Sequence, residues 1–405
     1  MTFLLHKDDN YVAIKRKINT IHSLQMHAVR ACLSVCPKGA LDYKRGKHCY
    51  AIVIDHDRCI GCGLCAKVCP SNYIFNDRVD FDRVTDKNVF LTYAKDENVQ
   101  FTSSSGGTVR TIAKEFVQHD NSFIYSLYEQ DNELECGVID GTLVDSMPNS
   151  IYAPTMWGRG LQQVKRLSAG SRLLVIGLPC QIKAAKKVID KYNKQIEAYY
   201  IAIICRKTKD FRFDIYIRDY HHIQGGDKRI TFRGYGWPGV IGSYTDSQYS
   251  QYSQFSLIPF GLDLWNIKGC YRCADCLAQD VADLSIGDPW TLDCVNDKGC
   301  NITFVNSSKG GVLLEQSRGS LYISSLSKEQ GESVLGRNMI SNKINRVRFY
   351  SKIDKRFSQR LKYFLLDSKS NMFGMLISRI GKYPYVDALG RVLIKIDRFI
   401  KQIFS

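Results

Sequence analysis

The cysteines between residues 59 and 69 are the residues whose spacing points most directly to chemistry. They form the run Cys59-Ile-Gly-Cys62-Gly-Leu-Cys65-Ala-Lys-Val-Cys69-Pro70, in which the spacing is C-x2-C-x2-C-x3-C. Three thiolates on one short loop can reach three irons of one cubane cluster, whereas the fourth cysteine points away toward a different cluster. The run therefore predicts a module that carries electrons.

A second piece, Cys32-Leu-Ser-Val-Cys36-Pro37, lies upstream and looks like the end of a partner run. Together the two pieces resemble bacterial two-cluster ferredoxins, in which each triplet takes its fourth ligand from the other run. On that pattern Cys36 completes the cluster of Cys59, Cys62 and Cys65. A zinc knuckle is the alternative for such C-x2-C pairs.

The partner cluster would take Cys32 and Cys69 together with positions 26 and 29. Those positions hold Met26 and Val29, which do not bind iron as thiolates do. The second cluster is therefore lost, incomplete or completed from elsewhere, with Cys49 as a candidate.

Another C-x2-C-x2-C triplet, Cys270-Tyr-Arg-Cys273-Ala-Asp-Cys276, lies far downstream and leaves one ligand position open. Cys205 and Cys180 follow predicted strands and are the candidates for the fourth ligand, while Cys294 and Cys300 come next in sequence. Zinc remains an alternative to iron here. Cys136 and Cys294 are predicted to be buried structural cysteines.

Two loops follow predicted strands and open predicted helices. The first, Ser103-Ser-Ser-Gly-Gly107, contains the candidate ligand-binding residues Ser104, Ser105, Gly106 and Gly107. The second contains Gly177, Pro179, Cys180 and Gln181. Glycines allow close approach of a ligand, and a helix N-terminus suits a pyrophosphate. A simple helix cap for the first loop and a tight, packed turn for the second are the alternatives.

Strand–turn–helix repetition between residues 88 and 210 predicts an α/β domain. Strands are expected at 50–55, 89–93, 173–176 and 196–205, and helices at 108–118 and 182–189. From residue 386 to 404, apolar residues recur at helical spacing with Arg391, Lys395, Arg398 and Lys401 between them, which predicts a basic amphipathic helix.

Charge and cysteine content restrict the class of protein. The net charge is +16, and residues 341–405 contribute 15 Lys/Arg against 4 Asp/Glu. A basic tail suits anionic partners, but no nucleic-acid-binding motif is present, so no nucleic-acid partner is expected. Fifteen cysteines without an export signal favour a reducing cytoplasm, and residues 386–404 could touch the inner face of a membrane.

These pieces, in this order, resemble the beta subunit of the coenzyme F420 hydrogenase/dehydrogenase family. The matching elements are Cys59–Pro70, Ser104–Gly107, Gly177–Gln181, Ile204-Cys205, Phe232–Trp237, the triplet at 270–276, and Ala282–Trp290. The resemblance implies one or two 4Fe-4S clusters and FAD, with the FAD near the two loops. It also implies electron exchange with an organic substrate or a deazaflavin-type acceptor.

The resemblance and the element pattern together predict four regions. Residues 1–80 form an α+β ferredoxin-like module, and 81–210 the first part of a mixed α/β flavin-binding domain. Residues 211–345 form its second part, with the second cysteine group, and 346–405 a basic amphipathic helical tail.

The chain departs from the family pattern at two places. Arg206 and Lys207 follow Cys205 where the family often has His-Gly, and Ile151 lies within a segment that often reads Ser-Lys-Tyr. No acid–base pair is evident, although Asp283 and Asp288 are polar candidates. We expect an iron–sulfur flavoprotein oxidoreductase that receives electrons from a ferredoxin or another redox protein, and the resemblance implies a role in exopolysaccharide synthesis. An electron carrier without FAD and a zinc-stabilised binding protein are the alternatives.

Overall fold

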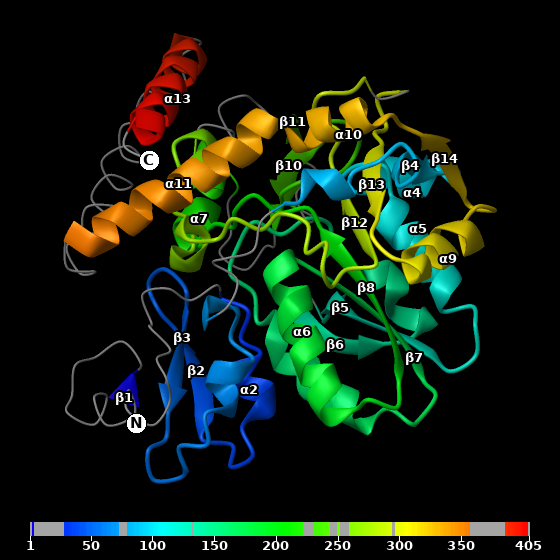
Figure 1. Ribbon diagram of the computed structural model, residues 1–405, viewed down its shortest axis with the longest axis vertical. Coiled ribbons are helices and arrows are strands. Elements are labelled where there is room, and N and C mark those ends of the chain that lie inside the picture. Colours follow the sequence, from blue (N-terminus) through cyan, green and yellow to red (C-terminus); the bar gives the residue numbers. More distant parts are fainter. Residues whose placement is uncertain are drawn as a thin grey trace.

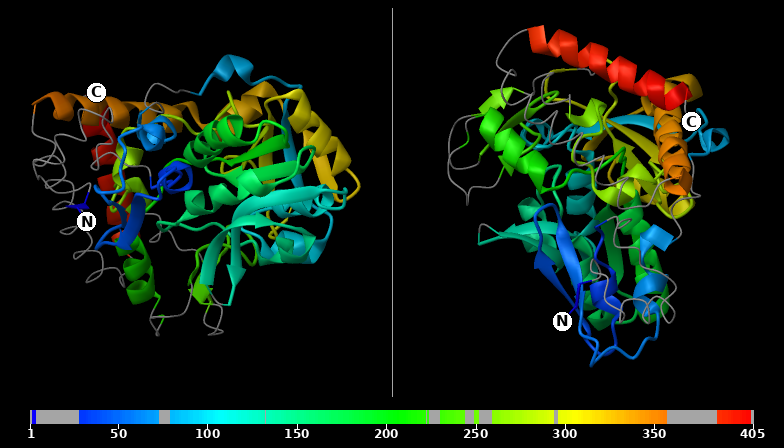
Figure 2. Two further views of the ribbon diagram at one scale, coloured as in Figure 1. Left: turned by 90° about the horizontal axis from the view of Figure 1, so that it is seen from below. Right: turned by 90° about the vertical axis from the view of Figure 1, so that its left-hand side faces the viewer.

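The computed structural model describes residues 2–3, 28–72, 79–131, 133–221, 223, 230–243, 249–251, 259–293, 296–356 and 385–403. A small N-terminal module of residues 28–72 lies beside a larger body that is built on an eight-stranded sheet (Figure 1). In Figure 1 and in the right-hand view of Figure 2, the module and the C-terminal helix α13 (Tyr385–Ile403) lie at opposite ends of the molecule.

The N-terminal module consists of an antiparallel sheet and short helices. The sheet has the order β1-β3-β2, with β1 (Thr2–Phe3), β2 (Leu41–Arg45) and β3 (Tyr50–Ile54). Helix α2 (Cys32–Val35) ends at Cys36, whose backbone is extended, as a residue before proline requires. Helix α3 (Leu64–Lys67) begins after Gly63, which has a φ of 73° in the left-handed region that glycine adopts easily. A 3-10 turn, η2 (Pro70–Asn72), follows.

The central sheet has the strand order β14-β4-β13-β12-β8-β7-β5-β6. Strands β5, β7, β8 and β12 are parallel neighbours, and the remaining pairs are antiparallel. The expected strands at 50–55, 89–93, 173–176 and 196–205 are confirmed. The eight strands are β4 (Val89–Ala94), β5 (Ser122–Gln130), β6 (Glu133–Ile139), β7 (Arg172–Gly177), β8 (Glu197–Ile203), β12 (Leu284–Gly287), β13 (Asn301–Val305) and β14 (Leu321–Ser325).

Helices cover both faces of this sheet, and the side chains of β7 show why. Leu173 and Val175 join the core under α6 (Pro179–Tyr192) and the 3-10 helix η6 (Trp157–Arg166). Leu174 and Ile176 face the other way, toward α5 (Thr108–Phe116) and α9 (Ser308–Gln316). Successive residues of a strand point to opposite faces, so a continuous apolar run indicates a strand buried on both sides.

The remaining elements lie at the carboxyl edge of the parallel strands and around it. They include the small antiparallel sheet β11-β10-β9 and a separate core formed by α7, Phe232, Leu264 and Trp265. Their bounds are η4 (Phe81–Arg83), α4 (Glu97–Thr102), η5 (Gly141–Ser146), α7 (Phe211–Tyr220), β9 (Ile230–Thr231), β10 (Val240–Ser243), β11 (Tyr249–Gln251), η7 (Lys268–Tyr271), α10 (Lys328–Leu335) and α11 (Arg337–Arg356).

The central sheet takes strands from both sides of the expected boundary at residue 210. Strand β12 pairs in parallel with β8, and β4 lies between β13 and β14. Residues 81–210 and 211–345 therefore share one sheet, since strands distant in sequence complete it. The hydrophobic pattern of one strand does not show which strands, far away in the sequence, become its neighbours in the sheet.

The N-terminal module docks on η6 through a close backbone contact. The Gly158 N–H donates a hydrogen bond to the Val29 carbonyl oxygen at 2.8 Å. A Cβ atom at Gly158 would lie 2.3 Å from the Ala31 nitrogen and 2.4 Å from that same oxygen. Backbone atoms cannot move aside as a flexible side chain can, so only glycine fits at this contact.

We therefore expect Gly158→Ala to loosen the docking of the module. Overpacking of this kind costs about 1 to 3 kcal/mol, so the thermal midpoint of the chain should fall by several degrees. Differential scanning fluorimetry under anaerobic conditions measures it. Gly311→Ala is the matched control, because nothing lies within 4 Å of its added Cβ and alanine favours the α9 helix. Equal midpoints for the two variants would contradict the contact.

Candidate functional site

The first group of thiols consists of Cys36, Cys59, Cys62 and Cys65, which we call the ferredoxin thiol group. Cys36 follows α2, Cys59 and Cys62 lie on the loop after β3, and Cys65 is in α3. Burial is the main cause that raises the pKa of Cys65 to about 12, and the nearby Cys62, Cys59 and Cys36 contribute to this rise. The Ala40 N–H also donates a hydrogen bond to Cys36 Sγ at 3.2 Å. These four residues are the ones expected to hold one cluster.

Cys32 and Cys69 lie near each other in the same module. Burial is the main cause that raises the pKa of Cys32 to about 12; Cys69 contributes to this rise, and the Arg30 guanidinium opposes it. The structure thus brings together the two cysteines assigned to the second cluster. It also brings a cation, Arg30, to the same place. Val29 is buried in the core between the module and η6, and Met26 lies outside the described residues.

The second group of thiols consists of Cys205, Cys270, Cys273 and Cys276, which we call the sheet-edge thiol group. Cys205 lies just beyond the carboxyl end of β8, and its N–H donates to the Cys276 carbonyl oxygen at 3.1 Å. Burial is the main cause that raises the pKa of Cys205 to about 12; Lys343 lowers this pKa, and Cys270, Cys273 and Cys276 raise it. The structure therefore brings Cys205, one of the candidate fourth ligands, to the triplet.

Cys180 also lies close to the sheet-edge thiol group, from the first turn of α6. Burial raises its pKa, and the next causes are Cys205, Cys273 and Cys270. The structure thus places both candidate fourth ligands, Cys205 and Cys180, near the triplet. Among the other cysteines, Cys136 is buried with its thiol donating to the Met156 carbonyl oxygen at 3.0 Å, as expected for a structural role. Cys294 lies outside the described residues.

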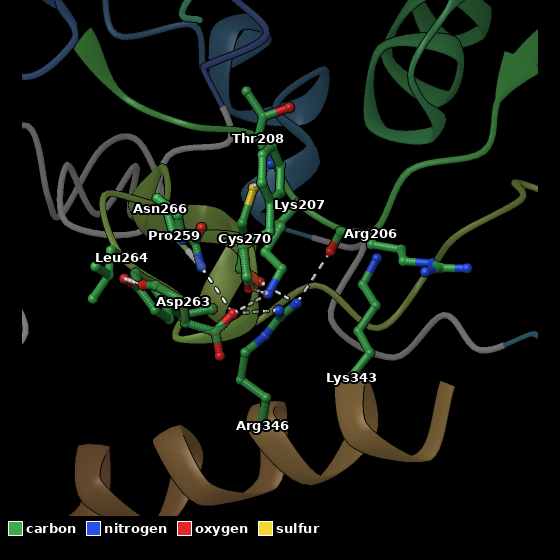
Figure 3. Close-up of polar contacts among 12 residues, drawn as sticks. Arg206, Lys207, Thr208, Pro259, Asp263, Leu264, Asn266, Cys270, Lys343 and Arg346 are labelled. Carbon is green, nitrogen blue, oxygen red and sulfur yellow. Dashed lines mark hydrogen bonds and ion pairs between the residues drawn. The ribbon is translucent and has the colours of Figure 1, made fainter. Parts of the chain in front are cut away.

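Helix α11 brings two buried cations to the sheet-edge thiol group (Figure 3). Lys343 Nζ lies 3.5 Å from Cys276 Sγ and donates to the carbonyl oxygen of Cys205 at 2.9 Å and to that of Asp275. Arg346 donates to the Cys270 carbonyl oxygen at 3.2 Å and pairs with Asp263 at 3.0 Å. Burial alone would lower the pKa of Lys343, but the neighbouring thiolates raise it above its ordinary value.

The chemistry of these residues fits an anionic metal cluster. Buried thiols ionise only with a compensating positive charge, which metal ions and the two cations of α11 can supply. Among the described residues, no group of three or more His, Cys, Asp or Glu side chains is arranged to hold a single metal ion. The thiolates of a cubane bind four different irons and need not converge on one point.

The Ser103–Gly107 loop lies at the same carboxyl edge, between α4 and the first turn of α5. Its two glycines are required by packing, because a Cβ at Gly106 would lie 2.7 Å from the Cys300 Cα and Gly107 has a φ of 75°. Ser104 Oγ accepts a hydrogen bond from the Ser150 N–H at 2.7 Å. The Ser103 hydroxyl is buried and has no hydrogen-bond partner among the described residues, so a polar ligand atom would satisfy it.

The Gly177–Gln181 loop is a tight, packed turn. Gln181 Oε1 accepts the Leu178 N–H at 2.7 Å, and a Cβ at Gly177 would lie 2.9 Å from both Gln181 Oε1 and the Trp157 ring. Gln181 is in the first turn of α6, and its side chain therefore caps the N-terminus of that helix. The geometry of this loop is explained by its own packing and by the placement of Cys180.

A buried ion pair connects the serine loop to the end of β12. Arg233 is 1% exposed and pairs with Asp288 at 2.6 Å, and it donates to the Ser104 carbonyl oxygen at 2.8 Å. The same guanidinium lies 5.4 Å from the ring centres of Trp237 and Trp290. Asp288, a candidate polar residue, thus belongs to this edge of the sheet.

Two further residues, Arg206 and Asp283, qualify the expectations from sequence. Burial lowers the pKa of Arg206, and its next neighbours include Cys276, Asp288 and Tyr152, so this departure from the family pattern lies at the site. Asp283 accepts the Tyr200 N–H at 2.8 Å and a hydrogen bond from Ser307 at 2.5 Å. Asp283 therefore joins β8 to the loop after β13 and has a structural role.

The sequence interpretation missed Arg30, Arg233, Lys343 and Arg346. A weak signal existed for α11, because Ile340, Lys343 and Val347 repeat at helical spacing and all three are buried. A cation in an apolar stripe can mark a buried charge that meets an anion. No comparable pattern singles out Arg30, and Arg233 is noted only as part of the matching segment Phe232–Trp237.

Fold and site together define an iron–sulfur protein, in which a ferredoxin module is joined to an α/β domain with a second thiol group. Residues 29–73 match the model of the 4Fe-4S dicluster domain, and residues 52–104 that of the 4Fe-4S single cluster domain. Residues 170–329 match the C terminus of the coenzyme F420 hydrogenase/dehydrogenase beta subunit. The expected resemblance is confirmed over residues 170–329.

Similar curated proteins match the ferredoxin region. An uncharacterized ferredoxin-like protein of Escherichia coli is 46% identical over 39 residues, which are 10% of this chain and 18% of that protein. An uncharacterized ferredoxin of Methanocaldococcus jannaschii is 36% identical over 80 residues, 17% of this chain and 50% of that protein. The chain thus spans between about a fifth and a half of the length of these relatives.

A solved structure shares the fold. A chain of the F420-reducing [NiFe] hydrogenase complex from Methanosarcina barkeri superposes with a TM-score of 0.50 at 13% identity. The match covers 66% of this chain and 91% of the other. At this identity the match shows a shared fold and nothing more.

The position of Lys343 next to Cys276 leads to a prediction about the sheet-edge thiol group. We expect Lys343→Met to make a cluster held there harder to reduce, because one buried positive charge beside it is lost. The midpoint potential should fall by about 60 mV or more, a tenfold change in a one-electron equilibrium.

A redox titration followed by electron paramagnetic resonance (EPR) measures this potential. Lys186→Met is the control, because Lys186 is exposed and pairs with Asp190 on the far part of α6. An unchanged potential in Lys343→Met, with iron content retained, would contradict the charge effect.

Proposed function

We propose that the chain is an iron–sulfur flavoprotein oxidoreductase, with a cluster on each of the two thiol groups and FAD at the carboxyl edge of the central sheet. The observation that carries this proposal is the meeting of Cys205 with Cys270, Cys273 and Cys276 at that edge, beside the Arg233–Asp288 pair and the serine loop. A metal site and a polar loop with an unsatisfied hydroxyl thus share one edge of the sheet.

The ferredoxin thiol group gives the chain an entry point for electrons from a ferredoxin or another redox protein. The module contacts the body near the sheet-edge group, since Cys49 packs against Ala28, Ile267 and Cys270. FAD, when bound, would exchange electron pairs with an organic substrate and single electrons with clusters. A deazaflavin-type acceptor and a role in exopolysaccharide synthesis are narrower forms of this proposal.

The residues of the chain have distinct roles in this proposal. Arg233 and the first turn of α5 would bind the phosphates of FAD, because both offer positive charge and N–H donors. Lys343 and Arg346 would compensate the negative charge of the cluster on the sheet-edge group. Ser103 would donate its hydroxyl to a ligand atom.

The test is one anaerobic preparation analysed for iron, sulfide, zinc and flavin. The proposal expects about eight irons and one FAD per chain. About eight irons without flavin would favour an electron carrier, an alternative supported by the close packing of Gly106 and of the Gly177–Gln181 loop. Zinc in place of iron would overturn both.

Arg233→Met tests the flavin site alone. We expect at least a tenfold loss of FAD affinity with iron content retained, because the variant removes the buried guanidinium at the serine loop. Fluorescence of released flavin after gel filtration measures the bound fraction. Arg318→Met, at an exposed pair with Glu315, is the control. Full flavin occupancy in Arg233→Met would place FAD elsewhere.

Helix α13 contains most of the segment for which a membrane contact is expected. No described helix is long and apolar enough to cross a membrane. Leu393 and Ile394 pack against the core around Phe213 and Leu264. An exposed apolar stripe at helical spacing faces away from this core, and Lys395 and Arg398 beside it are exposed. The stripe consists of Val392, Ile396, Phe399, Ile400 and Ile403.

We propose that this stripe lies on an anionic membrane surface. Phe399→Glu should then reduce sedimentation with phosphatidylglycerol vesicles several-fold, because it places a carboxylate in the apolar stripe. Val312→Glu, at an exposed apolar position of α9, is the control. Equal sedimentation of the wild type with neutral and anionic vesicles would contradict the electrostatic part.

A further inference from the structure

Arg30 occupies an unusual position immediately before α2. Its side chain is 4% exposed, and its φ of 69° lies in the left-handed region that a non-glycine residue adopts only at a cost. The guanidinium donates a hydrogen bond from Nη2 to Cys49 Sγ at 3.1 Å and another to the Tyr50 carbonyl oxygen. The backbone therefore aims a permanent positive charge into the interior of the module.

The thiols around this guanidinium are the ones left over from the ferredoxin pattern. Burial raises the pKa of Cys32, of Cys49 and of Cys69, and Arg30 lowers the pKa of each. Cys32 and Cys69 are the two cysteines that a second cubane would use, and Cys49 is the candidate replacement ligand. All three thus surround one cation.

Val29 closes another ligand position. It is 3% exposed, and it packs with Trp157 in the core between the module and η6. Its carbonyl oxygen accepts the Gly158 N–H at 2.8 Å, which holds the segment in place. A cubane here would need to displace both this apolar contact and a buried guanidinium, which would be left without partners at a high cost.

The Arg30 position lies between the two thiol groups. Cys65 of the ferredoxin group is among the neighbours that raise the pKa of Cys32, and Cys49 packs against Cys270 of the sheet-edge group. The two groups lie at opposite ends of α6, because Cys180 begins this helix and Tyr192, which has Cys62 and Cys36 as neighbours, ends it. A helix of this length rises about 20 Å.

We propose that Arg30 replaces the second cubane of a two-cluster ferredoxin in this chain, so that Cys32, Cys49 and Cys69 bind no iron. The proposal rests on the iron–sulfur part of the proposed function and makes it more specific. The chain then holds two clusters, with an arginine at the position between them. The match of residues 29–73 to a dicluster domain would therefore overstate the number of clusters in the module.

Anaerobic reconstitution of the full chain with iron and sulfide, followed by iron analysis and EPR spin counting, tests this proposal. The wild type should hold about eight irons. Cys32→Ala and Cys69→Ala should keep that number and the same EPR signals. The matched variants Cys36→Ala and Cys273→Ala should each lose about four irons.

Two outcomes would overturn the proposal while leaving the proposed function intact. One is a wild-type content of about eleven or twelve irons, with a third cluster in the EPR spectrum. The other is a loss of about three or four irons in either Cys32→Ala or Cys69→Ala. The wild-type count decides the matter even where a variant does not fold. Absence of iron from the wild type would overturn both the proposal and the proposed function.

Discussion

The need to compensate buried charge governs the arrangement of this protein. The sheet-edge thiol group lies in a dry part of the molecule, where isolated thiolates would not form. Helix α11 therefore contributes Lys343 and Arg346 from far along the chain, and Asp263 balances Arg346 in turn. This helix lies outside the region matched to the family, so the charge balance of the site depends on residues beyond the family domain.

In the N-terminal module, buried charge is compensated in a different way. There the ferredoxin thiol group retains four cysteines, but the neighbouring position contains three cysteines and an arginine. One cation can satisfy the hydrogen-bonding capacity of thiols that no longer converge on a metal. Cys32 and Val29 are buried in the interior of this arrangement, and Val29 takes part in the contact between the module and η6.

The central sheet explains why the sheet-edge thiol group and the candidate flavin residues meet. Strands β4, β7, β8 and β12 run in the same direction, so the loops that follow them open at one edge. Cys205 and Asp288 lie just after β8 and β12, Cys180 lies in the first turn of the helix after β7, and the serine loop follows the short helix after β4. Open parallel sheets place their ligand sites at this edge for the same reason.

The sequence by itself determined the local features, because these depend on spacing along the chain. The C-x2-C-x2-C-x3-C run, the buried strand at 173–176 and the helices at 108–118 and 182–189 could all be predicted in this way. The order of the strands, and hence the single sheet that joins residues 81–210 to 211–345, could not. Only the tertiary structure placed Cys205 and Cys180 beside the triplet and Arg30 among Cys32, Cys49 and Cys69. Contacts between residues so far apart depend on how whole elements pack, and no local periodicity records that packing.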